Sequence, residues 1–416
     1  MRLVPAALAF ALLAASGCAG SHPEAGSPAA SGDDLDARAV ALTRDALVVD
    51  THIDVPYRLQ NRPDDVSEAT ADGDFDYPRA VAGGLDVMFM SIYTPAGLQG
   101  TPGASAALAD SLIDMVEAIA EADPDKFAVV RSTADVERLR APGRVLFALG
   151  MENGAPIGDD LANLRRYAER GVRYVTLTHG RVNQISDSSY DSTRTWGGLS
   201  PFGEEVVRDM NRLGVMVDVS HVSDEAFYDV MDVTDVPVIA SHSSARRFTP
   251  GFERNMDDAM IRRLAENDGV IMINFGSSFL SERYRADSEA RNDALNEAIG
   301  AEAESRGLER GSPELDAFIE MFAPEFFAAN PIDMATLSDV ADHIDHVVDL
   351  VGIDHVGLGS DYDGVGPTLP YGLEDVSTYP ALTAELLRRD YSEADVRKIL
   401  GENLMRVWRA VEAAAE

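Results

Sequence analysis

Short apolar runs alternate with longer amphipathic stretches along most of this chain. The runs are rich in Val, Ile and Leu, and each one passes abruptly into polar residues. Such runs are typical of strands that are buried on both faces of a sheet. We predict strands at 47–50, 85–93, 145–151, 173–178, 215–219, 237–240, 270–275 and 355–359.

The stretches between these runs repeat apolar residues at helical spacing, most clearly at 105–122, 161–170, 203–213 and 257–267. Strands that alternate with helices predict a parallel sheet, and eight such units predict a (β/α)₈ barrel, also called a TIM barrel. With insertions, this fold accommodates a chain of 416 residues. We predict one barrel domain over 35–416, with a long helical insertion at 281–333 between the seventh and eighth strands.

Side chains that can bind metal ions closely follow the predicted strands. Enzymes with this fold build their active sites from residues at the C-terminal ends of the strands. Four of the eight histidines occur there, together with three acidic residues. The candidates are His52, Asp54, Glu152, His179, His221, His242 and Asp361.

Five of these candidates form two sets of metal ligands. His52 and Asp54 are separated by one residue, so in an extended segment both side chains leave the same face and can bind one ion. His221 and His242 each end a strand in similar sequence contexts, which suits a second ion. Two neighbouring cations need a bridging anion, and Glu152 is the candidate because it directly follows an apolar run and is flanked by glycines.

The bridge has one alternative, because many related two-metal barrels use a carboxylated lysine. This chain has two lysines, Lys126 and Lys398, and neither ends a predicted strand. Glu152 is therefore favoured as the bridging ligand.

A catalytic base is expected opposite the ligands, after the eighth strand. Asp361 and Asp363 both occur there, and we favour Asp361 because it comes first after the strand. His343, His346 and His355 lie in a predicted helix or before a strand, and we interpret them as structural.

The N-terminus has the features of an export signal. Within residues 1–18, Arg2 precedes an apolar run that ends in small residues and Cys18, the single cysteine of the chain. Bacterial lipoprotein signals place the lipidated cysteine there, whereas in a plain secretory peptide this cysteine would be incidental. Residues 19–34 are rich in Gly, Ser, Ala and Pro and suit a flexible tether. We predict an exported protein of the cell envelope or periplasm, lipid-anchored to a bacterial membrane.

Charge excludes one class of partner. Acidic residues outnumber basic residues by 71 to 35, which gives a formal net charge of −36. Such a surface repels phosphate backbones, so we do not expect nucleic acid as a partner.

Six ordered motifs resemble those of the membrane dipeptidases, also called renal dipeptidases. The resemblance runs from about residue 45 to the C-terminus. The motifs are VDTHID at 49–54, MENG at 151–154, LTH at 177–179, DVSH at 218–221, SHSSA at 241–245 and GSDYDG at 359–364. The resemblance implies an amidohydrolase-type barrel with two zinc ions per chain.

The resemblance also implies a role for each candidate residue. One zinc ion would be bound by His52, Asp54 and Glu152, and the other by Glu152, His221 and His242. His179 would contact the substrate or the tetrahedral intermediate, and Asp361 would bind substrate and transfer protons. An arginine would bind the carboxylate of the dipeptide, and Arg254 is better placed for this than Arg246 or Arg247.

The function that follows is hydrolysis of free dipeptides by metal-activated water, including dipeptides with a D-residue at the C-terminal position. Another amide, lactone or β-lactam hydrolase of the same barrel class is the first alternative. An inactive peptide-binding lipoprotein is the second. The sequence leaves a homodimer open.

Overall fold

The computed structural model describes residues 32–308 and 312–416. Its strands form one parallel sheet in the order β2-β1-β9-β8-β7-β6-β5-β4-β3, and a further pairing of β2 with β4 closes eight of them into a barrel. The predicted (β/α)₈ barrel is therefore confirmed. The strands are β1 (Val49–Ile53), β2 (Val87–Tyr93), β3 (Phe127–Val129), β4 (Val145–Glu152), β5 (Val172–Thr176), β6 (Met216–Asp218), β7 (Ile239–Ser243), β8 (Val270–Ile273) and β9 (Val356–Leu358).

One strand, β3, was not predicted. It pairs only with the first residues of β4, where Phe127 lies opposite Val145, and it stays outside the closed ring. β6 and β9 are equally short but fully buried, whereas the second and third residues of β3 are only half-buried.

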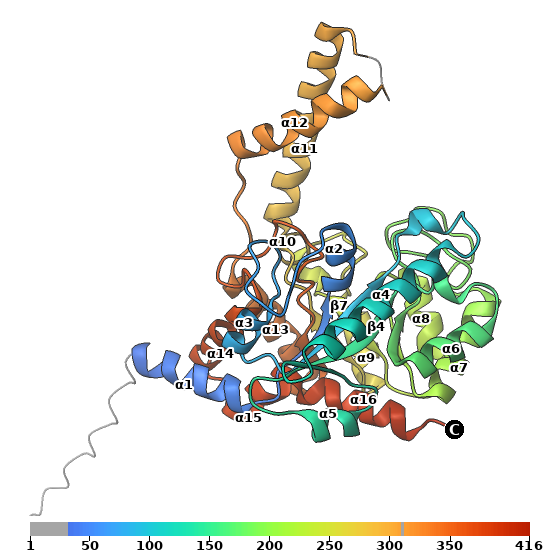
Figure 1. Ribbon diagram of the computed structural model, residues 1–416, viewed down its shortest axis with the longest axis vertical. Coiled ribbons are helices and arrows are strands. Elements are labelled where there is room, and N and C mark those ends of the chain that lie inside the picture. The colour runs from blue at the N-terminus through green and yellow to red at the C-terminus, as the bar shows by residue number, and fades with distance from the viewer. Residues whose placement is uncertain (1–31, 309–311) are drawn as a thin grey trace, which may run out of the picture.

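Helices surround the barrel (Figure 1). The four amphipathic stretches predicted from the sequence correspond to α4, α6, α7 and α9, with bounds that differ by at most two residues. The helices are α1 (Gly32–Asp45), α2 (Val55–Asn61), α3 (Tyr77–Gly83), α4 (Ala104–Ala122), α5 (Thr133–Leu139), α6 (Leu161–Arg170), α7 (Pro201–Leu213), α8 (Asp224–Val233), α9 (Asp258–Glu266), α10 (Ser277–Leu280), α11 (Glu282–Arg306), α12 (Pro313–Ala329), α13 (Leu337–Val351), α14 (Tyr379–Arg388), α15 (Glu393–Arg397) and α16 (Asn403–Ala413).

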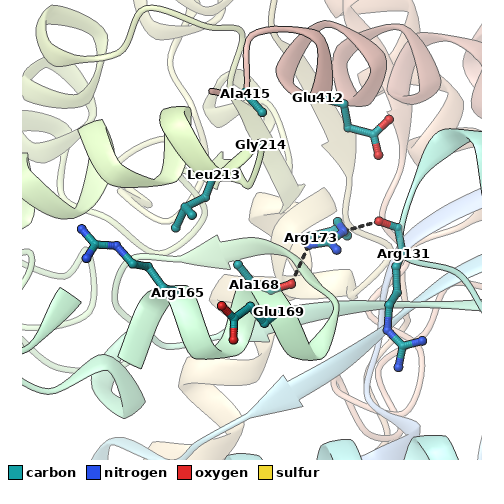
Figure 2. A pocket seen from close by; sticks show the side chains of 9 residues that line it. All are labelled: Arg131, Arg165, Ala168, Glu169, Arg173, Leu213, Gly214, Glu412 and Ala415. Carbon is teal, nitrogen blue, oxygen red and sulfur yellow. Dashed lines mark hydrogen bonds between the residues drawn. The ribbon is translucent and has the colours of Figure 1, made fainter. Parts of the chain in front are cut away.

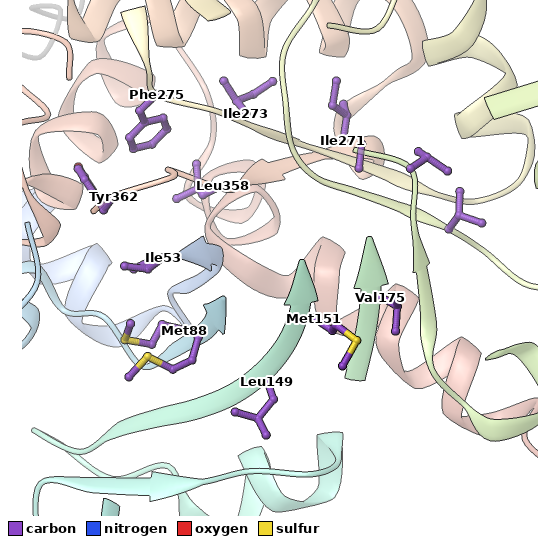
Figure 3. Packing of buried hydrophobic residues seen from close by; sticks show 14 of the residues in the cluster. Ile53, Met88, Leu149, Met151, Val175, Ile271, Ile273, Phe275, Leu358 and Tyr362 are labelled. Carbon is purple, nitrogen blue, oxygen red and sulfur yellow. The ribbon is translucent and has the colours of Figure 1, made fainter. Parts of the chain in front are cut away.

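Two hydrophobic clusters follow the alternation of side chains along the strands. In β4, Leu146 and Ala148 belong to the cluster inside the barrel, together with Trp408 of α16. Leu149 and Met151 belong to the larger cluster between strands and helices, part of which is shown in Figure 3. Because side chains alternate with a period of two, the last residue of β4, Glu152, continues the inward series.

The segment between β8 and β9 contains α11 and α12, which lie within the stretch 281–333 and extend away from the barrel as an arm (Figure 1). The first turns of α11 reach back to the C-terminal ends of the strands.

Residues 1–31 lie outside the described residues, and with them the predicted signal, Cys18 and most of the predicted tether. Export and lipid attachment therefore stay predictions. In the described part of the chain, no helix combines the length and the apolar character needed to cross a membrane.

Candidate active site

The C-terminal ends of the strands surround a cavity of about 640 Å³, a size that is typical of small-molecule sites. Its walls combine barrel loops with the start of α11. The lining side chains include Asp54, Glu152, His179, His221 and Asp361, all predicted from the sequence, together with Tyr284 of α11.

A second hollow, of about 360 Å³, lies where β5 begins, at the opposite end of the barrel (Figure 2). Its arginines already have partners. Arg131 pairs with Glu117 at 2.8 Å and Arg165 pairs with Asp209 at 3.2 Å, while Arg173 donates to backbone carbonyl oxygens. The cavity at the C-terminal ends is therefore the candidate active site.

Glu152 lies at the centre of this site, with its two oxygens facing different imidazoles. Oε1 is 3.1 Å from Nε2 of His221, 3.4 Å from Nε2 of His242 and 3.5 Å from Nε2 of His179. Oε2 is 3.4 Å from Nε2 of His52. This is the arrangement expected of a carboxylate that bridges two ions.

His52 and His242 lie inside their strands, whereas the sequence prediction placed them after the strand ends. β1 and β7 each continue three residues beyond the predicted end. The pairing register shifts at both places, between β1 and β2 and between β7 and β8. Such irregularities commonly re-aim a side chain beside an active site.

Asp361 lines the cavity beside the metal-binding candidates His52 and Asp54. Its Oδ2 accepts a hydrogen bond from Nδ2 of Asn274 at 2.7 Å, and the Asn274 amide is oriented because its Oδ1 accepts a backbone N–H. Burial raises the pKa of Asp361 well above its usual range, and the nearby carboxylates of Asp54 and Glu152 act in the same direction. A carboxyl group in this environment is suited to hold a proton.

Asp363, the alternative base, is engaged elsewhere. Its Oδ2 accepts from Nε of Arg58 at 2.9 Å, and its Oδ1 accepts from the backbone N–H of Asp74 at 2.6 Å. The geometry therefore favours Asp361.

The donor set fits divalent cations. Nε2 of His52 and Oδ1 of Asp54 are buried and have no hydrogen-bond partner, which is rare for buried polar atoms and is explained by a bound cation. Three groups of ligand atoms lie within 4.8 Å of one another: His52, Glu152 and His242; Glu152, His179 and His221; and His52, Asp54 and Asp361. Glu152 and His52 each belong to two groups, and of these two Glu152 has a second carboxylate oxygen with which to bridge two ions. His179 and Asp361 also belong to these groups, and the assignment of each residue to one of two ions stays a prediction.

Electrostatics in the cluster also favour cation binding. Burial alone would lower the pKa of His52, but Tyr174 and the carboxylates of Glu152 and Asp54 raise it well above its usual range. Burial lowers the pKa values of His221 and His242 well below theirs. Both of these rings are therefore neutral, which is the form that binds metal.

Arg254 is buried beside the cavity rather than on its wall. It donates to Oγ of Ser243 at 2.6 Å and to the carbonyl oxygen of His242 at 2.7 Å, and its guanidinium lies over the ring of Phe279. Arg246, which the sequence disfavoured, is held by Asp224 in a bidentate pair.

Sequence reasoning missed the residues that hold the candidate ligands. Tyr174 contacts His52, and Ser241 contacts His242 and Asp218. Ser241 and Asp218 stand within the quoted SHSSA and DVSH motifs, so this signal was present. Tyr174 gave none, because it is an ordinary residue of a buried strand.

The three remaining described histidines lie away from the cluster, in agreement with a structural interpretation. His346 pairs with Asp258, and His355 contacts the carbonyl oxygen of Gly269. His343 on α13 is fully buried, and its Nδ1 accepts from the backbone N–H of Ala245 at 3.0 Å.

His343 predicts a loss of stability in acid. Burial lowers the pKa of His343 from 6.5 to about 4, so the folded protein resists protonation of this ring. Its contribution is complete above pH 6.5 and is lost as the pH falls toward 4. Between pH 7.5 and 4.5 we expect wild type to lose about 2 to 3 kcal/mol more than His343→Gln, measured by urea unfolding. Parallel losses in both proteins would contradict this assignment.

Comparison with known proteins agrees with this geometry. The family model described as membrane dipeptidase, peptidase family M19, matches residues 36–416. Dipeptidase tcpJ of Claviceps purpurea (strain 20.1) is 35% identical over 360 residues, which are 85% of this chain and 73% of the relative. Dipeptidase aclJ of Aspergillus oryzae is 36% identical over 349 residues, which are 82% of this chain and 71% of the relative.

Solved structures show the same fold. The "probable dipeptidase PvdM" of Pseudomonas aeruginosa superimposes with a TM-score of 0.77 at 28% identity, covering 92% of this chain and all of the other. A metallopeptidase of Rhodobacter sphaeroides, solved with a phosphinate mimic of the dipeptide L-Ala-D-Ala, has a TM-score of 0.70 at 26% identity, covering 88% and 99% of the two chains. We conclude that the chain belongs to the membrane dipeptidase family, peptidase family M19, and is a metal-dependent dipeptidase.

Proposed function

We propose that this dipeptidase uses two zinc ions, with Glu152 as the ligand common to both. The observation that carries the proposal is the position of the Glu152 oxygens, one facing His221 and His242 and the other facing His52. Imidazole and carboxylate ligands, without a thiolate, suit zinc in a catalytic site.

Side chains of the protein would then transfer protons and stabilise the developing negative charge. Bound zinc ions would lower the pKa of water and polarise the peptide carbonyl. Asp361 would hold the proton taken from the attacking water and deliver it to the leaving amine. His179, whose ring lies 4.2 Å from that of His221, would donate a hydrogen bond to the oxygen that becomes negative.

Arg254, which lies beside the cavity and not on its wall, would attract the free carboxylate of the substrate by its charge. It is a buried cation that forms no ion pair with any residue in 32–308 or 312–416. A buried charge without a counter-ion is costly, so an incoming carboxylate would be favoured. Tyr190 and Phe279 line the cavity next to it and would contact the C-terminal residue of the dipeptide.

The substrates would be free dipeptides, including those with a D-residue at the C-terminus. The cavity volume of about 640 Å³ suits a short peptide. The complex of the Rhodobacter sphaeroides relative with an L-Ala-D-Ala mimic supports tolerance of the D-residue.

A substrate panel tests this function. On zinc-loaded protein we expect turnover of L,L and L,D dipeptides, and at least tenfold lower kcat/KM for the corresponding dipeptide amides, which lack the carboxylate. Faster hydrolysis of a lactone, a β-lactam or an N-acylated amino acid would assign the site to another reaction of this barrel class. Zinc content below two ions per chain after loading would refute the two-metal centre.

A further inference from the structure

Two of the candidate metal-binding imidazoles are oriented by hydrogen bonds from the inside of the barrel. Nδ1 of His52 lies 2.8 Å from the hydroxyl of Tyr174, and that hydroxyl lies 3.0 Å from the carbonyl oxygen of Thr51. A carbonyl oxygen can only accept, so the Tyr174 hydroxyl donates to Thr51. Its lone pairs are then left to accept the Nδ1–H of His52. In the neutral ring, the form that binds a metal ion, the Nε2 lone pair of His52 therefore faces Asp54 and Glu152.

His242 is held by a parallel chain of contacts. Its Nδ1 lies 2.7 Å from Oγ of Ser241, which lies 2.6 Å from Oδ2 of Asp218. Because a carboxylate accepts, the Ser241 hydroxyl donates to Asp218 and accepts from Nδ1–H of His242. Asp218 is fixed in turn by the backbone N–H groups of Ser220 at 3.0 Å and Ser241 at 2.8 Å.

These partners are built into the barrel interior. Tyr174, Ser241 and Asp218 are all fully buried. The ring of Tyr174 occupies the space that Gly150 leaves open, since a Cβ atom at position 150 would lie 2.0 Å from Cζ of Tyr174. Any side chain at position 150 would push this hydroxyl away from His52.

His221 lacks such a partner. Its Nδ1 is buried without a hydrogen bond, and the residue has a positive φ of 69°. No hydrogen bond at Nδ1 orients this ring, which instead packs against the rings of His179, Tyr190 and His242. The three histidines thus differ in how firmly each is oriented.

We propose that Tyr174 and the Ser241–Asp218 pair are positioning residues that present Nε2 of His52 and of His242 to the metal ions. This inference rests on the proposed metal centre. Outer hydrogen bonds of this kind fix the tautomer and the ring direction of a ligand histidine, and their loss typically weakens metal binding about 10- to 100-fold.

The test measures Zn²⁺ affinity by competition with a chelator, in Tyr174→Phe and Ser241→Ala. Each change removes one hydroxyl and leaves the ligands themselves in place. We expect affinity for at least one ion to fall about 10- to 100-fold in each variant, while the Tm of the metal-free protein stays within a few degrees of wild type. Tyr167→Phe and Ser105→Ala are the matched controls, because both residues are buried on helices outside the cavity lining. Both controls should bind zinc as wild type does.

Affinities within twofold of wild type would overturn the proposal. An affinity loss would also overturn the proposal if the Tm of the metal-free variant fell by more than a few degrees, because the hydroxyl would then be structural. The readout is independent of catalysis. Wild type that binds two zinc ions but leaves dipeptides intact would refute the proposed function and leave this inference standing.

Discussion

Asp361→Asn should keep both zinc ions while kcat for a free dipeptide falls roughly 10²- to 10⁴-fold, the usual range for loss of a general acid–base. Asp361 lines the cavity and faces the ligand cluster, and its carboxylate is oriented by Asn274 at 2.7 Å. An amide has the same shape but cannot take up a proton. Asn also tolerates the left-handed backbone of this position, where φ is 64°, so the change should add no strain. The measurements are kcat, zinc content and Tm.

Asp363→Asn is the matched control, with the same charge change at the same φ of 64°. Asp363 pairs with the buried Arg58, so this variant should lose stability while kcat stays within a few-fold of wild type. A near-normal kcat in Asp361→Asn with a large loss in Asp363→Asn would move the base two residues along the chain. Loss of zinc from Asp361→Asn would make Asp361 a ligand, which its distance from His52 and Asp54 permits.

The barrel could be predicted because its strands are continuous apolar runs, but two strand ends could not. Beyond the predicted ends, β1 continues with the buried polar residues 51 and 52, and β7 continues with the buried polar residues 241–243. Thr51, for example, donates to the carbonyl oxygens of Leu358 on the neighbouring strand β9 and of Ser241 on β7. A polar residue that is satisfied by a distant partner looks like a loop residue in the sequence. The predicted strands therefore stopped before His52 and His242.

The candidate ligands were predictable because imidazoles and carboxylates after buried strands are conspicuous. Their partners were not, because the contacts span the sequence. Tyr174 is 122 residues from His52, and Arg58 is 305 residues from Asp363. The choice between Asp361 and Asp363 rested on order along the chain. The hydrogen bond from Arg58, which follows β1, to Asp363 becomes visible only in the folded barrel.

Glu152→Gln should abolish the two-metal centre. Both oxygens of Glu152 face imidazoles, and Oε2 also accepts from the hydroxyl of Ser91 at 3.1 Å. The amide carries no charge and directs N–H groups toward one set of ligands, so it cannot neutralise two cations. We expect zinc content after loading to fall from two ions per chain to one or fewer, and kcat/KM for dipeptides to fall by at least about 100-fold, beyond the effect typical of outer contacts.

Glu205→Gln on α7 is the control for this change, because Glu205 is exposed and the loss of charge is the same. It should retain two zinc ions and full activity. Retention of two ions by Glu152→Gln would show that the ions do not depend on a shared carboxylate. The groups formed by His52 with Asp54 and by His179 with His221 would then have to bind them separately. Zinc content distinguishes a shared Glu152 from two separate sites even if both arrangements lose activity. If Glu152 is the bridge, removal of its negative charge must weaken the binding of at least one ion.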